Sequence, residues 1–165
     1  KMMAPTRARH ALSRLAARAF SDSADASAAT QRAELYKASM KHVRAGMGWS
    51  VEAIAAGAQD LGWSPGAHGI YARGAAELVE DFARETNAAV RQQLLDTPAV
   101  EGQPTADKLR HAIDLRLDRL KPYASSWAQA IALQALPHNV RHTAHTVGEA
   151  VDITWDYGHD MLALP

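Results

Sequence analysis

Three histidines near the end of the chain have a spacing that could bind a metal ion. His138, His142 and His145 are four and three residues apart, so a helix here would place their imidazoles on one side. Glu149 and Asp152 continue roughly along that side, and three imidazoles with a carboxylate could bind zinc. The sequence has no His-Glu-x-x-His motif, however, and His138 lies at a proline corner. We therefore favour solvated histidines and predict no metal.

Other catalytic chemistry has less support. Ser125 and Ser126 lack a Gly-x-Ser-x-Gly motif, so nothing would activate their hydroxyls. The glycine-rich residues 66–74 have neither a preceding strand nor a lysine that would hold a phosphate. The chain contains no cysteine, which excludes a thiolate zinc site and a cysteine nucleophile. Hydrolytic catalysis is not expected.

The elements that position these residues are predicted to be helices. The chain has 165 residues, is rich in alanine and has no apolar run long enough to span a bilayer. Ser50 and Thr105 have the position of helix N-caps, and Pro122 and Pro137 mark breaks. Apolar spacing predicts one all-α domain over 31–160 with helices over 31–46, 51–61, 75–95, 105–121, 124–136 and 141–157.

The order of the first helices is that of a helix-turn-helix half, which raises the question of DNA binding. Residues 46–90 contain two basic and six acidic residues, a net charge of −4. Since affinity for DNA depends on neutralising phosphates, this acidic half would repel a duplex. We predict no nucleic acid partner.

The first 21 residues form a separate basic segment. It contains five Lys and Arg residues and no acid, and a stretch rich in Ser and Ala follows it. These features are typical of a mitochondrial transit peptide, and the alternative is an amphipathic helix that docks on a partner. We expect residues 1–30 to be an arm with a linker, and residues 161–165 to be a tail.

Four stretches together resemble the mitochondrial coenzyme Q (ubiquinone) biosynthesis accessory family, the lipid-binding partners of the demethoxyubiquinone hydroxylase. They are "GWSVEAIAAGAQDLG", "LRHAIDLRLDRLKPY", "WAQAIALQALPHN" and "VDITWDYG", in this order and at family-like spacing. The resemblance covers about residues 33–160. It implies the fold of TetR-type regulators without their DNA binding, and a protein that is not an enzyme and has no cofactor beyond a bound lipid or quinone precursor.

The resemblance also implies the sites. The partner-binding patch of the family corresponds here to Leu136, Pro137, His138, Asn139, Asp152, Trp155 and Tyr157. An exposed corner with tryptophan and tyrosine beside it is typical of an interface, and the alternative is that the two rings fill the core. An isoprenoid lipid would lie in the carboxy-terminal half, against Leu117, Trp127, Ile131 and Leu133.

Family members continue into dimerisation helices and an amphipathic membrane helix, which the sequence ending at Pro165 is expected to lack. The resemblance implies peripheral attachment to the matrix face of the mitochondrial inner membrane. The alternative function is a structural or assembly subunit of a respiratory complex or ATP synthase that reuses this fold.

Overall fold

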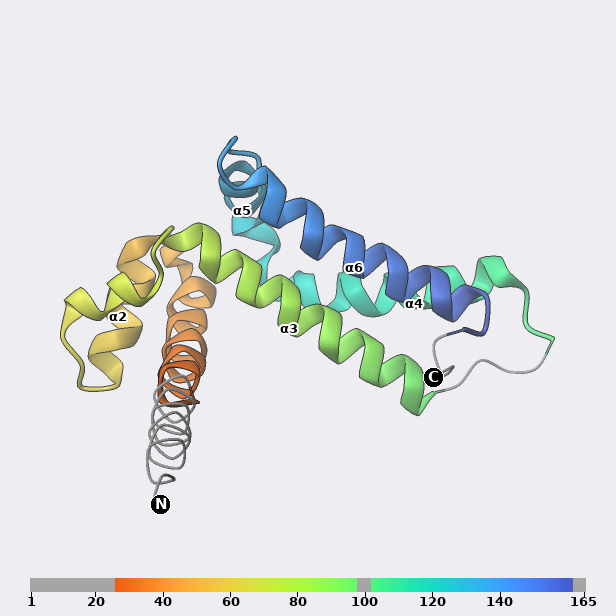
Figure 1. Cartoon of the computed structure of the whole chain (residues 1–165), viewed down its shortest axis with the longest axis horizontal. Coiled ribbons are helices and arrows are strands. Elements are labelled where there is room, and N and C mark those ends of the chain that lie inside the picture. Colours follow the sequence, from red (N-terminus) through yellow and green to blue (C-terminus); the bar gives the residue numbers. More distant parts are fainter. Residues whose placement is uncertain (1–25, 98–101, 162–165) are drawn as a thin grey trace, which may run out of the picture.

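The computed structural model describes residues 26–97 and 102–161, which form helices and no strands (Figure 1). The predicted all-α class is therefore confirmed. The predicted transit segment lies outside the described residues. The chain is already helical at residue 26, so the folded part begins earlier than the predicted residue 31. None of the described helices combines the length and the apolar character needed to cross a lipid bilayer.

Four helical elements make up the described amino-terminal part of the chain before α3. A helix over 26–42 leads into the π-helical turn η1 (Val43–Met47), which α2 (Val51–Asp60) and the 3-10 helix η2 (Pro65–Ile70) follow. Gly46 has a φ of 109°, which favours glycine and ends the first helix. Ser50 caps α2 as predicted. A helix-turn-helix has a second helix after its turn, but the segment that follows α2 here is only the short 3-10 helix η2. The likeness to TetR-type regulators stays a prediction.

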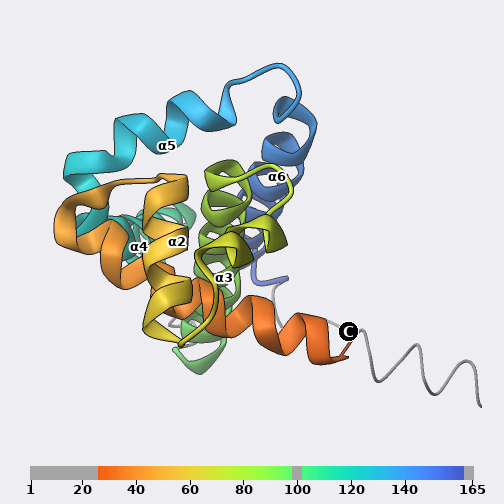
Figure 2. The ribbon, with the colours of Figure 1, turned by 90° about the vertical axis from the view of Figure 1, so that its left-hand side faces the viewer.

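The long helix α3 (Ala75–Asp96) leads from these elements into the carboxy-terminal half. The elements after it are α4 (Thr105–Leu120), the 3-10 helix η3 (Lys121–Ser126), α5 (Trp127–Gln134) and α6 (Val140–Gly158). Helices α3, α4 and α6 pack against one another, whereas α5 runs across them (Figures 1 and 2).

From α2 onward the helix bounds agree closely with the predicted ranges, and two local predictions differ. The stretch 121–126 around Pro122 is a 3-10 helix, so α5 begins later than predicted. The predicted cap at Thr105 is wrong, because Thr105 is already helical and Pro104 takes the N-cap position without a side-chain cap bond.

An aromatic core joins the two halves of the chain around Trp49, whose side chain is 1% exposed. Its ring lies 5.4 Å from Phe82 of α3, 5.6 Å from Tyr123 of η3 and 6.0 Å from Trp127 of α5, measured between centroids. Offset and edge-on contacts of this kind stabilise aromatic pairs beyond the area they bury. This core therefore fixes α5 relative to α3.

A second, smaller core lies farther along α3. It consists of the buried side chains of α3, α4 and α6, namely Val90, Leu94, Ala112, Ile153 and Tyr157. This core fixes one face of α6 and leaves the opposite face free of it.

Candidate functional site

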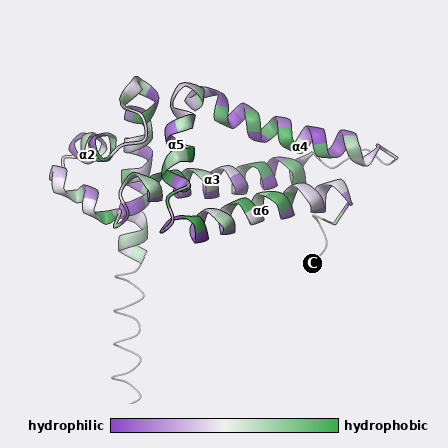
Figure 3. Ribbon diagram, turned by 90° about the horizontal axis from the view of Figure 1, so that it is seen from above, coloured by the Kyte–Doolittle hydropathy of each residue, from purple (hydrophilic) through white to green (hydrophobic). Residues whose placement is uncertain are grey.

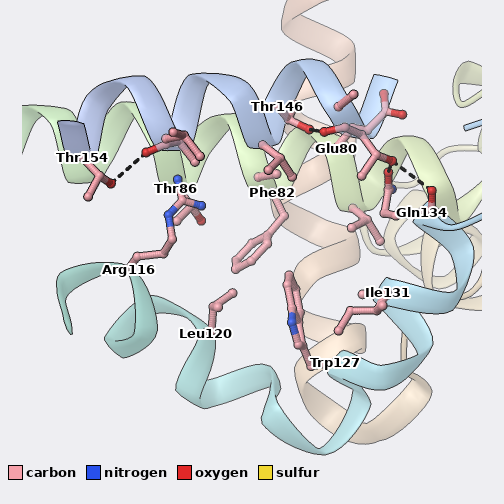
Figure 4. Close-up of a pocket in the computed structure, with 18 of the residues that line it drawn as sticks. Glu80, Phe82, Thr86, Arg116, Leu120, Trp127, Ile131, Gln134, Thr146 and Thr154 are labelled. Carbon is pink, nitrogen blue, oxygen red and sulfur yellow. Dashed lines mark hydrogen bonds between the residues drawn. The ribbon is translucent and has the colours of Figure 1, made fainter. Parts of the chain in front are cut away.

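An open cleft lies between α3, α4, α5 and α6, with a volume of about 890 Å³. The side chains of Phe82, Leu120, Trp127 and Ile131 point into it from three of these helices (Figure 4). Nearly all of its lining is apolar. A cleft of this size and character is typical of sites that bind small apolar ligands.

Helix α6 supplies the most exposed wall of this cleft. Apolar positions recur along the helix between polar ones (Figure 3). Ile153 and Tyr157 are buried against α3 and α4. Val147, Val151 and Trp155 line the cleft instead, and they remain 55%, 58% and 55% exposed. A contiguous apolar stripe that stays exposed marks an interaction or ligand site.

The predicted lipid-binding residues divide into two groups. Trp127 and Ile131 line the cleft as expected. Leu133 packs against the aromatic core and is not among the residues that line the cleft. Leu117 is 50% exposed and does not line the cleft, although it neighbours Ile113 and Leu120, which do.

The proline corner between α5 and α6 is exposed in part, as the resemblance required. Leu136, Pro137 and His138 are exposed. Asn139 is fully buried, contrary to the expected surface position. Its side chain therefore does not contribute surface for a partner.

Asn139 instead joins the corner to the start of α3. Its Oδ1 accepts a hydrogen bond from Arg73 Nη1 at 3.0 Å, and its Nδ2 donates to the Leu133 carbonyl at 2.9 Å. Arg73 also donates to both carboxylate oxygens of Glu80 at 2.6 Å. Burial of these polar groups is tolerated because each has partners. Asn139 therefore fixes the shape of the exposed corner from within.

Of the two aromatic residues of α6 that were expected at the surface, Trp155 and Tyr157, only Trp155 is exposed. Asp152 and Trp155 are exposed, and the Trp155 ring stacks on that of His159 with centroids 4.2 Å apart. Tyr157 is buried, and its hydroxyl donates to the Thr97 carbonyl at 3.3 Å. Two residues along a helix rotate the side chain by more than half a turn, so Trp155 and Tyr157 face opposite sides. The expectation that both rings are exposed is wrong for Tyr157.

The histidines do not form a metal site. Within residues 26–97 and 102–161, no group of three or more His, Asp or Glu side chains is placed to hold a metal ion. His138, His142 and His145 are all exposed to solvent.

Two arginines that contact the first turns of α3 are engaged by carboxylates. Besides its bonds to Glu80, Arg73 lies 3.3 Å from Glu77. Arg32 pairs with Glu77 at 2.9 Å and with Asp81 at 2.8 Å. Because these charges are already compensated, neither arginine is free to neutralise a phosphate.

One cation lies in the wall of the cleft itself. Arg116 reaches from α4 toward α3 (Figure 4), where one of its terminal nitrogens donates to Asn87 Oδ1. Burial lowers the pKa of the Arg116 guanidinium from its ordinary value. No carboxylate within the described ranges forms an ion pair with it. The cleft is thus apolar with one positively charged point.

The sequence analysis did not identify several residues of this cleft. Val140, Val147 and Val151 line it from α6, and Ile113 and Arg116 line it from α4. A signal was present in α6, since apolar residues occur on two faces of that helix and a single core contact can bury only one. No signal in the sequence distinguishes Arg116 from the other arginines of α4.

The fold and the cleft define an all-helical protein with an open apolar binding site and an exposed corner beside it. No family model matches the chain.

Curated relatives identify the family. The chain is 34% identical over 120 residues to the human ubiquinone biosynthesis protein COQ9, mitochondrial, which is 69% of this chain and 38% of the relative. It is 33% identical over 132 residues to the Drosophila melanogaster protein of that name, covering 78% of this chain and 40% of the relative. It is 29% identical over 123 residues to a probable ubiquinone biosynthesis protein of Dictyostelium discoideum, covering 71% and 40%.

Over the matched residues the chain belongs to this family of mitochondrial ubiquinone biosynthesis proteins, as its four motifs indicated. It spans about two fifths of the length of these curated relatives.

Proposed function

We propose that this protein is a non-catalytic accessory protein of ubiquinone biosynthesis at the matrix face of the mitochondrial inner membrane. It binds an isoprenoid lipid or quinone precursor in the apolar cleft and docks on the demethoxyubiquinone hydroxylase through the α5–α6 corner. The observation that carries the proposal is the cleft of about 890 Å³, which lies within a chain homologous to proteins named for this pathway.

The chemistry of the cleft supports a lipid as the ligand. Its walls offer many carbon atoms, and burying an apolar tail against them is favoured by about 25 cal/mol per Å². A long tail also suits an open cleft, because it can follow the α6 stripe of Val147, Val151 and Trp155.

Two neighbouring residues of α4 allow a matched test of lipid binding. Ile113 lines the cleft and is 48% exposed, whereas Leu117 is 50% exposed and lies outside it. We expect Ile113→Asp to weaken binding of a quinone with a ten-carbon tail by roughly tenfold or more, because a carboxylate would be desolvated beside the tail. Leu117→Asp should leave binding unchanged. Quenching of tryptophan fluorescence by the quinone measures both, and equal losses in the two variants would contradict the proposal.

The docking surface consists of the exposed members of the predicted patch. Leu136, Pro137 and His138 form the corner, and Asp152 and Trp155 continue it on α6. A tryptophan that is 55% exposed beside an apolar corner is a typical centre of an interface. Asn139 and Tyr157 support this surface from the core.

A docking test can avoid the cleft. Leu136 is 41% exposed and does not line the cleft, and Leu95 at the far end of α3 is 39% exposed. Leu136→Asp should abolish co-purification of the hydroxylase from mitochondria, and Leu95→Asp should retain it. If the unaltered protein instead brings down subunits of a respiratory complex or of ATP synthase, the structural-subunit alternative replaces the accessory role.

A further inference from the structure

The polar side chains of the cleft differ in whether they have partners. Gln134 donates to the Ala76 carbonyl, and Thr143 donates to Gln134 Oε1 at 2.6 Å. Thr146 and Thr154 bond to carbonyls within α6. Glu80 is held by Arg73, as described above. These groups already have hydrogen-bond partners within the protein, so none of them needs a polar ligand atom.

Thr86 is different. This residue of α3 lines the cleft and is fully buried, yet its hydroxyl has no hydrogen-bond partner among residues 26–97 and 102–161. A buried hydroxyl without a partner costs about 1–3 kcal/mol, so such groups in native proteins usually have a reason to persist. Completion by a ligand oxygen is one such reason.

Arg116 is a second polar residue of the cleft wall, and within the described residues it makes a single hydrogen bond. Its guanidinium reaches α3 (Figure 4), where it donates to the neutral amide of Asn87, the residue that follows Thr86 in the chain. That amide is held by the Thr146 carbonyl at 3.0 Å and by Glu149 Oε2 at 3.1 Å. Asn87 therefore stands between the guanidinium and the Glu149 carboxylate. The remaining N–H groups of Arg116 are available to a ligand.

Resting on the proposed function, we propose that Arg116 and Thr86 bind the acidic head group of the lipid, a carboxylate or a phosphate. The tail then runs past Leu120 and Phe82 toward Trp127, whose side chains point into the cleft (Figure 4). The guanidinium supplies charge-assisted hydrogen bonds to the oxyanion, and the Thr86 hydroxyl donates one more.

The charge of Arg116 is the reason to choose an acidic head over a neutral one. A half-buried guanidinium whose direct partner is a neutral amide has lost part of its hydration without gaining a direct ion pair. A carboxylate or phosphate supplies that charge, whereas an alcohol or quinone oxygen supplies only a hydrogen-bond acceptor.

Probes with identical tails separate the head group from the tail. Palmitic acid, hexadecanol and hexadecyl phosphate are compared by displacement of a fluorescent lipid from the full chain. We expect the two acids to bind roughly 10- to 100-fold more tightly than the alcohol, because hydrogen bonds to charged groups contribute more than neutral ones. The ratio between the two acids shows whether a carboxylate or a phosphate is preferred.

Substitutions of Arg116 and Thr86 test whether these two residues cause the preference for acidic head groups. Arg116→Met should remove the preference for acids while leaving hexadecanol affinity within about twofold, because the apolar stem still packs on the tail. Arg110→Met is the control, since Arg110 is on the same helix with a side chain that is 73% exposed. Thr86→Val should lower affinity for the acids several-fold without lowering the thermal midpoint, because it removes a hydroxyl that has no partner in the free protein.

The outcomes distinguish this inference from the function on which it rests. Equal affinity of the unaltered protein for acid and alcohol would overturn the head-group assignment while leaving lipid binding intact. A preference for acids that persists in Arg116→Met would overturn it as well. If no probe binds, the lipid-binding function itself fails, and this inference fails with it.

Discussion

Two tryptophans of this chain lie in opposite surroundings. Trp49 is 1% exposed and has aromatic rings on several sides, whereas Trp155 is 55% exposed at the edge of the cleft. Phe82 and Trp127 belong to both regions, because they pack on Trp49 and also line the cleft. The closed aromatic core is therefore the floor of the open cleft.

The difference shows how a small helical protein can keep an apolar surface open without losing its fold. The buried contacts of α6, through Ile153 and Tyr157, hold the helix in place. Its other face, with Val147, Val151 and Trp155, is then not needed for folding and can be reserved for a ligand. If this is correct, substitutions in the two regions should affect stability very differently.

Among the truncations to alanine, the largest effect is expected from Trp49→Ala. Removing a fully buried ring leaves a cavity among Phe82, Tyr123 and Trp127, and such changes cost about 3–5 kcal/mol of unfolding free energy. Trp155→Ala should cost less than about 1 kcal/mol, because more than half of that side chain is already in water. Urea unfolding measures both. Similar costs for the two variants would mean that Trp155 contributes to the core.

A second test concerns the contact between the first helix and α2. A Cβ added at Gly57 would lie 2.6 Å from the backbone nitrogen of Ser39, which a rotamer change cannot relieve. Gly57→Ala should therefore separate the two helices and cost about 1–3 kcal/mol. The thermal midpoint should fall accordingly. An unchanged midpoint would show that the amino-terminal elements are less tightly packed than described.

The corner between α5 and α6 tests whether Asn139 belongs to the closed region. Asn139→Ala leaves the Leu133 carbonyl without this donor and Arg73 without this acceptor, at a cost of about 1–3 kcal/mol. His138→Ala, at the exposed neighbouring position, should change stability by less than about 0.5 kcal/mol. Equal effects in chemical unfolding would place Asn139 at the surface, as the sequence analysis expected.

A glycine of α6 with open space beside its Cα gives an effect of the opposite sign. A Cβ at Gly148 would meet nothing within 4 Å. Gly148→Ala should therefore raise the unfolding free energy by about 0.5–1 kcal/mol, because alanine loses less backbone entropy in a helix. Calorimetry would detect the higher midpoint. A loss of stability would mean that the open face is more constrained than its exposure indicates.

Local patterns were sufficient to predict the helices. The spacing of Leu78, Phe82 and Val90 identified α3 to within one residue at each end, and Ser50 correctly marked the start of α2. These signals depend on neighbours within a few positions. The 3-10 stretch after α4 was not foreseen because a proline indicates that a helix stops, not what replaces it.

The burial of individual site residues depended on distant partners. Asn139 was expected at the surface because it is polar and lies at a corner, but Arg73 is 66 positions away and no local pattern links them. Trp155 and Tyr157 were both expected at the surface because the family motif contains both, although residues two positions apart in a helix point to different sides. The cleft itself could not be predicted, because its walls come from α3, α4, α5 and α6 together.

The smallest change in stability is expected from Val151→Asp, on the exposed stripe of α6. Val151 is 58% exposed, so the substitution should alter the unfolding free energy by no more than about 0.5 kcal/mol. Ile153→Asp, two residues along and 8% exposed, should prevent stable folding because it buries a carboxylate between α3 and α4. Binding of a hydrophobic dye should fall in Val151→Asp while the circular dichroism spectrum stays unchanged. If Val151→Asp melts the helix, the exposed stripe takes part in folding, and the separation between a closed core and an open cleft is wrong.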